Sequence, residues 1–366
     1  MKKIVRCIIS ILLVCTFISG TVIAAEPEIN ETITKEIQNK NPEPFIIDSD
    51  FSSDVDDILA ISTACYYMDQ RLIDVKGVAL CTMSARGAYA MSALLHAHGY
   101  GNIPIASAGE NGIAIGSKWI LNMSNQNHDE DYVYGTTKFY RKLLSQSENP
   151  VNIVSLGQLT NLSDLLNSKP DAYSPLTGSE LISEKVKCLY AVAGKSDGKL
   201  ENNVYYGGED YGNNKYYGNT GVAQAAKNVA RNWTSPIIWM EADLVGNFSV
   251  GEFFKENDLT HSDIISQALV DQGQTWGSAS FDPFGVTIAA LHANNLLTVN
   301  MIDLTKGTMR INLNGTSYFT ENDQAKEHYR IHKLTTDAYY KCIINKGLAF
   351  EYQKRSGKTI NLTINL

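Results

Sequence analysis

The sequence predicts a single α/β domain built on an open, mostly parallel sheet that is flanked by helices. Two observations lead to this fold class. Short apolar runs of strand length alternate along the chain with longer segments whose apolar residues recur at helical spacing, an order typical of parallel sheets covered by helices. No linker and no break in composition divides the 366 residues, so one domain accounts for the folded part.

The first half of the chain carries this alternation most clearly. Phe45–Ile47 is a short apolar run of strand type, and Asp54–Met68 follows with helical spacing and an Asp-rich first turn. Val75–Leu80 and Ile103–Ile105 are expected to be strands, and Ala85–His98 the helix between them. This β-α-β-α-β order predicts neighbouring parallel strands.

The second half continues the pattern and ends in a different one. Strands are expected at Val151–Leu156, Val186–Ala193 and Pro236–Met240, and helices at Asn161–Leu166, Gly221–Trp233, Asp282–His292 and Thr335–Lys346. Leu297–Tyr318 is expected to be a β-hairpin or meander with turns at Lys306-Gly307 and Asn314-Gly315. Lys195–Thr220, rich in Gly, Asn and Tyr, is expected to be a long loop, either a binding loop or a surface excursion.

The N-terminus has the three-part pattern of a secretory signal. Three basic residues precede the apolar run Ile8–Ile23, and small residues up to Ala25 offer a cleavage site before the chain becomes polar. We therefore expect a signal peptide over 1–25, a flexible leader over 26–43 and the domain over 44–366, with the mature protein exported to a periplasm or secreted. An uncleaved membrane anchor is the alternative, although the run is short for a span.

The charge of the chain excludes one class of partner. Removal of the signal would lower the formal net charge from −8 to −11, because the signal contains three basic residues and no acidic one. Such an acidic protein is a poor binder of nucleic acid polymers, whereas single nucleosides or sugars lack a ladder of phosphates. No further apolar run is long enough for a span, so no membrane partner is expected after cleavage.

Four cysteines lie outside the signal: Cys65, Cys81, Cys188 and Cys342. None belongs to a Cys-x-x-Cys pair, so a zinc site built from them is not expected. An exported protein can form disulfides, while Cys65 and Cys81 lie in apolar stretches that also suit buried thiols. The sequence leaves the pairing open.

The strongest local signal is a group of five carboxylates within ten residues, at the junction of a predicted strand and helix: Asp48, Asp50, Asp54, Asp56 and Asp57. Ligands of open α/β sheets bind at the carboxyl ends of strands, where this group lies. Crowded carboxylates repel one another, and a helix N-terminus offers only about 0.3–1 kcal/mol per charge. A hard, oxygen-binding cation such as Ca²⁺ would compensate them. An acidic helix cap alone would not explain Asp48 and Asp50.

Two other motifs share the Asp-x-Asp beginning. An EF-hand loop starting at Asp48 would need Gly where Ser53 stands and Glu where Leu59 stands, and a helix rather than a strand would precede it. A phosphatase of the haloacid dehalogenase type has a strand followed by Asp-x-Asp-x-Thr, and Ser52 would replace its Thr. The phosphatase stays an alternative, although it leaves the later aspartates unexplained.

Three segments together resemble the inosine-uridine nucleoside hydrolase (nucleoside N-ribohydrolase) family. Ile46–Asp50 and Val55–Ala60 resemble its fingerprint of a strand, Asp-x-Asp, a short turn and Asp-Asp-Ala, with a turn two residues longer than usual and Ser in place of Gly. Leu156–Asn161 looks like the family's Gly-Pro-Leu-Thr-Asn turn, and Phe281–Pro283 like its late His-Asp-Pro element. These segments occur in the family's order.

The resemblance implies a calcium site and a mechanism. Asp50, Asp57, the carbonyl of Thr160 and Asp282 would bind Ca²⁺, which would hold a water and two ribose hydroxyls. By the same resemblance, Asp50 would act as the general base for that water. Asp56 would bind a ribose hydroxyl, and Asp48 would support the metal ligands from behind.

The family's Glu-x-Asn element over the ribose has two possible counterparts. Glu201 and Asn203 have the right residue types, but an insertion separates them from the next predicted helix. Asn219 has nearly the right distance to that helix, but Tyr217 stands where Glu is expected. We prefer Glu201 and Asn203 as the ribose ligands and keep Asn219 as the second choice.

Phe281 departs from the family, many members of which carry at this position a His that protonates the leaving base. Phenylalanine donates no proton, although its ring could stack on a base. Three explanations stay open: another acid such as His96, His98 or His128, a leaving group that needs no acid, or binding with little turnover.

The leading hypothesis is an exported hydrolase that releases a base from a nucleoside or related riboside. The alternatives are a nucleoside- or sugar-binding protein of the same fold and a different metal-dependent hydrolase, and relatives of the family are often homo-oligomers.

Overall fold

The computed structural model describes residues 41–113, 116–129, 131–205, 219–258, 260–274, 276–297 and 301–360. The predicted signal peptide and all but the end of the predicted leader therefore lie outside the described residues. Glu43, assigned to the leader, already belongs to strand β1 (Glu43–Ser49), and its carboxylate lies 2.6 Å from Lys187 Nζ. Residues 41–43 of the predicted leader thus lie within the described structure. Among the described helices, none is long and apolar enough to cross a membrane.

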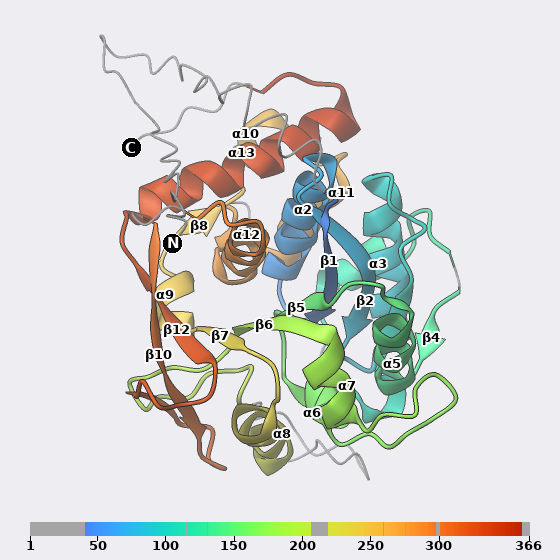
Figure 1. Ribbon diagram of the computed structural model, residues 1–366. Coiled ribbons are helices and arrows are strands. Elements are labelled where there is room, and N and C mark those ends of the chain that lie inside the picture. Colours follow the sequence, from blue (N-terminus) through green and yellow to red (C-terminus); the bar gives the residue numbers. More distant parts are fainter. Residues whose placement is uncertain are drawn as a thin grey trace, which may run out of the picture.

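The predicted fold class is confirmed by a ten-stranded sheet in the order β11-β10-β12-β7-β6-β5-β1-β2-β3-β4 (Figure 1). The strands from β12 to β4 in this order run parallel, and β10 and β11 form an antiparallel hairpin at one edge. The strands after β1 are β2 (Ile73–Leu80), β3 (Ile105–Ser107), β4 (Val133–Tyr134), β5 (Val151–Ser155), β6 (Val186–Val192), β7 (Ile237–Met240), β10 (Ile302–Ile311), β11 (Ser317–Glu321) and β12 (His328–Lys333). Strands β8 (Ser249–Val250) and β9 (Ser278–Ala279) form a separate pair.

Helices cover both faces of the sheet (Figure 1). Those packed in the larger core include α2 (Asp56–Asp69), α3 (Ala85–Ala97), α4 (Lys118–Met123), α10 (Phe253–Asn257), α11 (Ile264–Gln272), α12 (Phe281–Ala293) and α13 (Asp337–Ser356), with α9 (Ala242–Val245) beside α12. The smaller core takes in α5 (Thr136–Gln146), α6 (Thr160–Leu166), α7 (Gly178–Lys185) and α8 (Asn219–Asn232). A 3₁₀ turn, η1, spans Gly109–Asn111.

Strand β1 shows why a continuous apolar run was the right signal for a central strand. Phe45 and Ile47 pack into the larger core, whereas Ile46 between them packs into the smaller one. Side chains of a strand point alternately to the two faces, so a strand covered on both faces needs apolar residues at every position. The carboxyl end of this strand carries the aspartate motif.

The structure corrects one predicted turn. Lys306-Gly307 lies within β10, and Gly307 pairs with Glu321 of β11. Glycine is needed there for packing, because a Cβ would lie 2.3 Å from a ring carbon of Phe319. The predicted turn at Asn314-Gly315 does join the two strands, with Gly315 at φ 82°. Helix α13 continues ten residues past its predicted end at Lys346.

The four cysteines carry free thiols, buried at Cys65, Cys81 and Cys188 and partly exposed at Cys342. Of the long predicted loop Lys195–Thr220, residues 206–218 lie outside the described part of the chain, and α8 begins at Asn219.

Candidate metal centre and active site

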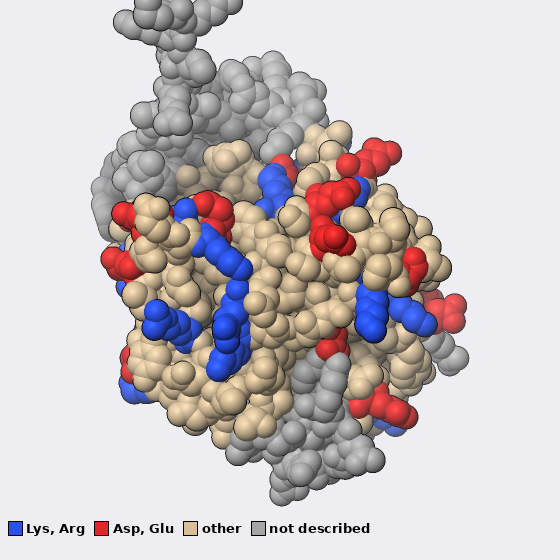
Figure 2. Space-filling model, turned by 60° about the horizontal axis from the view of Figure 1, so that its bottom comes forward, with Lys and Arg blue, Asp and Glu red and all other residues tan. Residues whose placement is uncertain are grey.

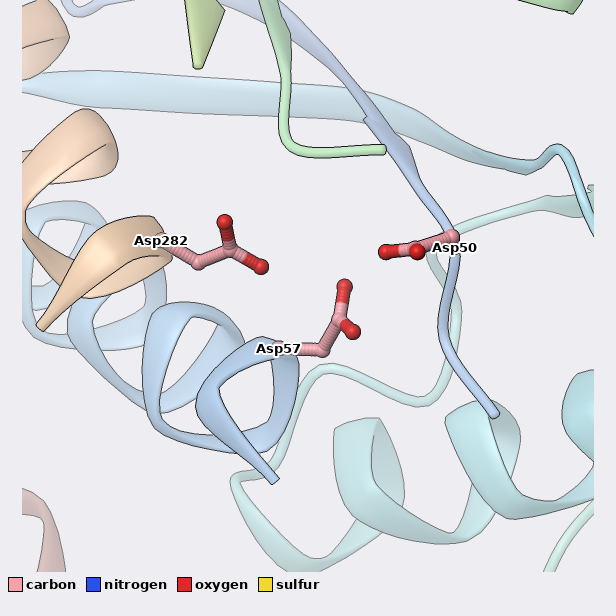
Figure 3. A group of neighbouring side chains, drawn as sticks. All are labelled: Asp50, Asp57 and Asp282. Carbon is pink, nitrogen blue, oxygen red and sulfur yellow. The ribbon is translucent and has the colours of Figure 1, made fainter. Parts of the chain in front are cut away.

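Three aspartates from distant parts of the sequence converge at the carboxyl end of β1 (Figure 3). Asp50 follows β1, Asp57 lies in the first turn of α2, and Asp282 lies in the first turn of α12. One carboxylate oxygen of each lies within 4.8 Å of those of the other two, and all three residues are buried. Figure 3 shows the carboxylates pointing toward a common point between the three segments.

The local folding of the motif loop explains how Asp57 reaches this point. The loop is anchored by Phe51, which is fully buried with its ring edge-on to Trp119 at a centroid distance of 5.0 Å. Ser49 Oγ accepts from the Phe51 backbone N–H and donates to Asp57 Oδ1 at 2.5 Å. The last residue of the strand therefore ties the loop to the first turn of the helix. Serine at position 49 is a positioning residue that the motif comparison did not single out.

Asp282 is brought to the cluster by close packing of α12 on the sheet. A Cβ on Gly285, one turn into α12, would lie 2.4 Å from Val192 Cγ2 at the end of β6. Glycine at this position thus lets the helix approach the carboxyl ends of the strands. Helix α12 also packs along α2, so its first turn faces the first turn that carries Asp57.

Burial and mutual repulsion raise the pKa of every carboxyl group in the cluster. Burial, with the charge of Asp54 second, raises the pKa of Asp50 to about 7. Burial first, and then the charge of Asp50, holds the pKa of Asp57 well above its usual value, and burial followed by the charge of Asp57 does the same at Asp282. Ionised carboxylates in this place therefore need a compensating cation.

The donor set fits a hard divalent cation. Oxygen ligands lie about 2.3–2.6 Å from a bound Ca²⁺, so two ligands on opposite sides of the ion are about 5 Å apart. The three aspartate oxygens, within 4.8 Å of one another, have this spacing. Thr160, the fourth predicted ligand, is buried and is the first residue of α6, directly after the turn that passes Asp50.

The turn before Thr160 lies in direct contact with Asp50. A Cβ on Gly157 would lie 2.5 Å from the Asp50 backbone N and 2.7 Å from its Cβ, closer than real Cβ contacts. Gln158, the next residue, donates from Nε2 to Asp50 Oδ2 at 3.0 Å. Its Oε1 accepts from Cys81 Sγ at 3.3 Å. Gln158 stands where the family turn has Pro, and its amide fixes one oxygen of Asp50.

We predict that Gly157→Ala displaces Asp50 and weakens binding of a divalent cation at the aspartate cluster at least about tenfold, a loss of roughly 1.4 kcal/mol. The methyl group would meet backbone rather than a flexible side chain, so Asp50 or the turn has to shift. Calcium titration by calorimetry measures the loss. Gly116→Ala is the matched control, since a Cβ there meets nothing within 4 Å, and equal affinities in the two variants would contradict the prediction.

Asp48 holds the start of α6 against β1. Its Oδ2 accepts from Tyr140 Oη at 2.7 Å and from Asn161 Nδ2 at 2.9 Å, and Asn161 Oδ1 in turn accepts from Thr136 Oγ1. Burial raises the pKa of Asp48 to about 7. The contacts place Asp48 behind the cluster, tied to the residue that follows Thr160. Tyr140, on a helix that the sequence did not predict, had no signal in the motif.

Asp56 is buried beside the cluster rather than in it. Its Oδ1 accepts from the Asp57 backbone N–H at 3.1 Å, and its own N–H donates to Asp54 Oδ1. Burial and the charge of Asp282 hold the pKa of Asp56 well above its usual value. Asp54, Asp56 and Asp57 also bring oxygens within 4.8 Å of one another.

Glu201 and Asn203 stabilise the turns around the site. The Glu201 carboxylate accepts from the backbone N–H groups of Gly194 and Asn203, and burial raises its pKa to about 7. The Asn203 amide donates to the carbonyls of Leu156 and Val192, at the ends of two strands. All these polar groups are engaged within the protein, and ribose binding by them stays a prediction. Asn219 begins α8, and its side chain lies outside the described residues.

Phe281 lies next to Asp282, against the end of α9. A Cβ on Gly246 would lie 2.0 Å from the ring, so the aromatic side chain rests on the glycine backbone. Phe281 therefore lies beside the aspartate cluster, and its position is fixed by apolar packing on Gly246.

Two of the three histidines suggested as the missing acid, His96 and His98, lie away from the aspartates. Helix α3 begins beside the motif loop, where Gly87 lies close to Ser52, and runs away from it. His96 is 11 residues into this helix, about 16 Å along its axis at about 1.5 Å per residue. His98 beyond it is buried, with Nδ1 2.7 Å from Glu351 Oε2. His128 lies against Tyr89 with ring centroids 4.9 Å apart, and its Nδ1 lies 2.7 Å from the Gln126 carbonyl. A role of His128 as the acid stays a prediction.

The chain has the fold of the nucleoside hydrolases. A plant nucleoside hydrolase, PpNRh1, is 15% identical with a TM-score of 0.61, over 84% of this chain and 99% of that one. The inosine-uridine preferring nucleoside hydrolase of Bacillus anthracis is 12% identical with a TM-score of 0.58, over 83% and 99%. The type III effector XopQ, solved with adenosine diphosphate ribose, is 12% identical with a TM-score of 0.55, over 87% and 97%. No protein-family model and no curated protein matches the sequence.

Proposed function

We propose that the protein is an exported hydrolase that cleaves the N-glycosidic bond of a ribonucleoside or related riboside, giving ribose and a free base. The observation that carries the proposal is the convergence of Asp50, Asp57 and Asp282 at the carboxyl end of β1. The likeness of the whole fold to solved nucleoside hydrolases supports it, because those proteins are named for this reaction.

The proposed cofactor is Ca²⁺, held by Asp50, Asp57, Asp282 and the carbonyl of Thr160. When bound, such an ion lowers the pKa of a water and orients the sugar hydroxyls. The all-oxygen ligand set favours a hard cation over zinc. Neither cluster of potential metal ligands among the described residues contains a cysteine, and Cys81, which lies nearby, donates its Sγ–H to Gln158 Oε1.

Asp50 is the proposed general base. Gln158 donates to its Oδ2, and this fixes the plane of the carboxylate and leaves Oδ1 directed away from the amide.

Asp56 and Asp48 have separate proposed roles, one in binding the sugar and one in holding the metal site. Breaking an N-glycosidic bond builds positive charge on the ribose ring, and buried carboxylates nearby stabilise that charge. Asp56 is the proposed partner of a ribose hydroxyl. Asp48 holds Thr160 and Asn161 in place through the bond to Asn161 Nδ2.

The leaving group receives no proton from Phe281. General acid catalysis raises rates by about 10²–10⁴-fold. Without an acid, substrates whose leaving group is stable as an anion should therefore react faster than ordinary nucleosides by about this factor. Packing of the ring against an aromatic or apolar leaving group is a further part of the proposal.

Hydrolysis of p-nitrophenyl riboside, inosine and uridine, each with calcium and with chelator, tests the proposal. Nitrophenolate leaves without protonation, so we expect calcium-dependent cleavage of p-nitrophenyl riboside. Cleavage of inosine and uridine should be slower than this by a factor of about 10² or more. Comparable rates on all three would mean that another residue supplies the acid.

Two outcomes would overturn the proposal. If protein shown to hold calcium cleaves none of the three, binding of a nucleoside or nucleoside diphosphate sugar becomes the better account, as the XopQ complex illustrates for that protein. Release of phosphate from a phosphorylated substrate would instead favour the phosphatase alternative. Export through a signal over 1–25 and assembly into a homo-oligomer are further parts of the proposal that rest on the sequence alone.

A further inference from the structure

A cavity of about 460 Å³ lies between helix α8 and the strands β10 and β12. Its lining contains four cationic side chains, Lys227, Arg231, Arg310 and Lys326, and no carboxylate. This end of the molecule is at the bottom of Figure 1, and Figure 2, which turns it forward, shows Lys and Arg side chains gathered left of the centre of the view. Such a group is unexpected in a chain with a formal net charge of −8.

The cations are not compensated within the described part of the chain. Neither Lys227 nor Arg310 forms an ion pair or a side-chain hydrogen bond with any described residue. Lys326 Nζ donates to the Arg231 carbonyl at 2.8 Å, which fixes its position at the end of α8 without neutralising it. Glu327, the nearest acid in sequence, is turned to Lys306 and Tyr329 instead. Like charges held together this way repel one another, and an anion would relieve the repulsion.

One buried side chain of the lining carries a polar atom without a hydrogen-bond partner in the described structure. His328 lines the cavity, is only 2% exposed, and its Nε2 has no hydrogen-bond partner in the described structure. A buried polar group without a partner costs about 1–3 kcal/mol, and such groups call for an explanation. Burial lowers the pKa of His328 to about 4, so at neutral pH the ring is uncharged and can offer an N–H.

We propose that this cavity binds a small anion carrying two or more phosphate groups. Lys and Arg are the side chains that phosphate oxygens prefer, and Thr308 adds a hydroxyl to the lining. The volume lies in the range of small-molecule sites, about 300–1,000 Å³, and exceeds what a single phosphate fills. None of the aspartates of the metal centre lines the cavity, so the inference does not depend on the proposed hydrolase activity.

Calorimetric titration with inorganic pyrophosphate tests the proposal, with orthophosphate and sulfate as single-anion comparisons at matched ionic strength. Calcium is omitted, because pyrophosphate chelates it. We expect saturable one-to-one binding of pyrophosphate, clearly tighter than that of orthophosphate. The double variant Lys227→Gln with Arg310→Gln should weaken it about tenfold or more. Circular dichroism establishes that the variant is folded.

The matched control is Lys142→Gln with Lys169→Gln, which removes the same charge from two exposed lysines outside the cavity. Wild-type affinity in this control, together with the loss in the cavity variant, supports the proposal. Absence of saturable binding to the wild type, equal weakening in both double variants, or equal affinity for orthophosphate and pyrophosphate would each overturn it.

Discussion

Replacing Asp57 with asparagine is expected to abolish calcium binding and to lower p-nitrophenyl riboside hydrolysis about a thousandfold or more, roughly 4 kcal/mol of transition-state stabilisation. The substitution keeps the shape of the side chain and an oxygen that can accept from Ser49 Oγ, so the motif loop stays anchored. It removes one of three anionic oxygens that converge within 4.8 Å. An ion that depends on several carboxylates is held far less tightly by two.

The same substitution should not destabilise the protein without calcium. Asp57 is fully buried among like charges, and burial and the charge of Asp50 are what raise its pKa. A neutral amide removes that repulsion, so the melting temperature in chelator should equal or exceed that of the wild type. Loss of activity with unchanged or higher stability separates a role in metal binding from a role in folding.

Asp74→Asn provides the control, because Asp74 is a half-exposed carboxylate paired with Lys76 on the surface. It should bind calcium and turn over substrate as the wild type does. Full calcium affinity in Asp57→Asn would sink the assignment of this aspartate as a ligand. A large drop in its melting temperature in chelator would mean that the carboxylate is a folding element instead.

The fold could be predicted from sequence where local pattern and tertiary burial agree. The run Phe45–Ile47 is buried on both faces of the sheet, and continuous apolar sequence is the signature of that environment. At Gly307 the local sequence pattern and the tertiary environment disagree. A glycine after a polar residue predicts a turn, but this one makes room for the cross-strand ring of Phe319, a contact that only the paired strand supplies.

The same limit applies to the site. Asp50, Asp57 and Asp282 could be named from motifs because their order along the chain matches a family pattern, and the structure brings them together. The residues that hydrogen-bond to the aspartates and hold them in place could not be predicted from the sequence. Tyr140 bonds Asp48 across 92 positions of sequence, and Gln158 bonds Asp50 across 108. Such partners are fixed by packing of separate elements, and no local spacing encodes them.

The pH dependence of stability is the second large effect that we expect. The metal-free protein should lose stability as the pH rises, and bound calcium should restore it. Burial raises the pKa of Asp48 and Asp50 to about 7, from an ordinary value of 3.8. Between these values the folded, metal-free protein holds protons that the unfolded chain has released. Its free energy of unfolding therefore falls as the pH rises from about 4 to 7.

Calcium binds the ionised forms of these carboxylates, so it competes with the protons and binds more tightly as the pH rises. At free calcium 100-fold above its dissociation constant the expected stabilisation is about 2.7 kcal/mol. For a domain of this size that corresponds to a rise in melting temperature of roughly 4 °C. We expect such a rise at pH 8 and little or none at pH 5, measured by calorimetry with calcium and with chelator.

Other raised carboxyl groups, such as Glu351 with a pKa of about 8, add to the pH dependence of the wild type without calcium. The informative quantity is therefore the difference between the calcium and chelator curves at each pH, compared with the same difference in Asp57→Asn. This subtraction cancels groups that do not touch the ion. A calcium effect that is equal at pH 5 and pH 8, or that survives in Asp57→Asn, would place the ion elsewhere on the protein, because only buried carboxylates that must lose protons give binding this dependence.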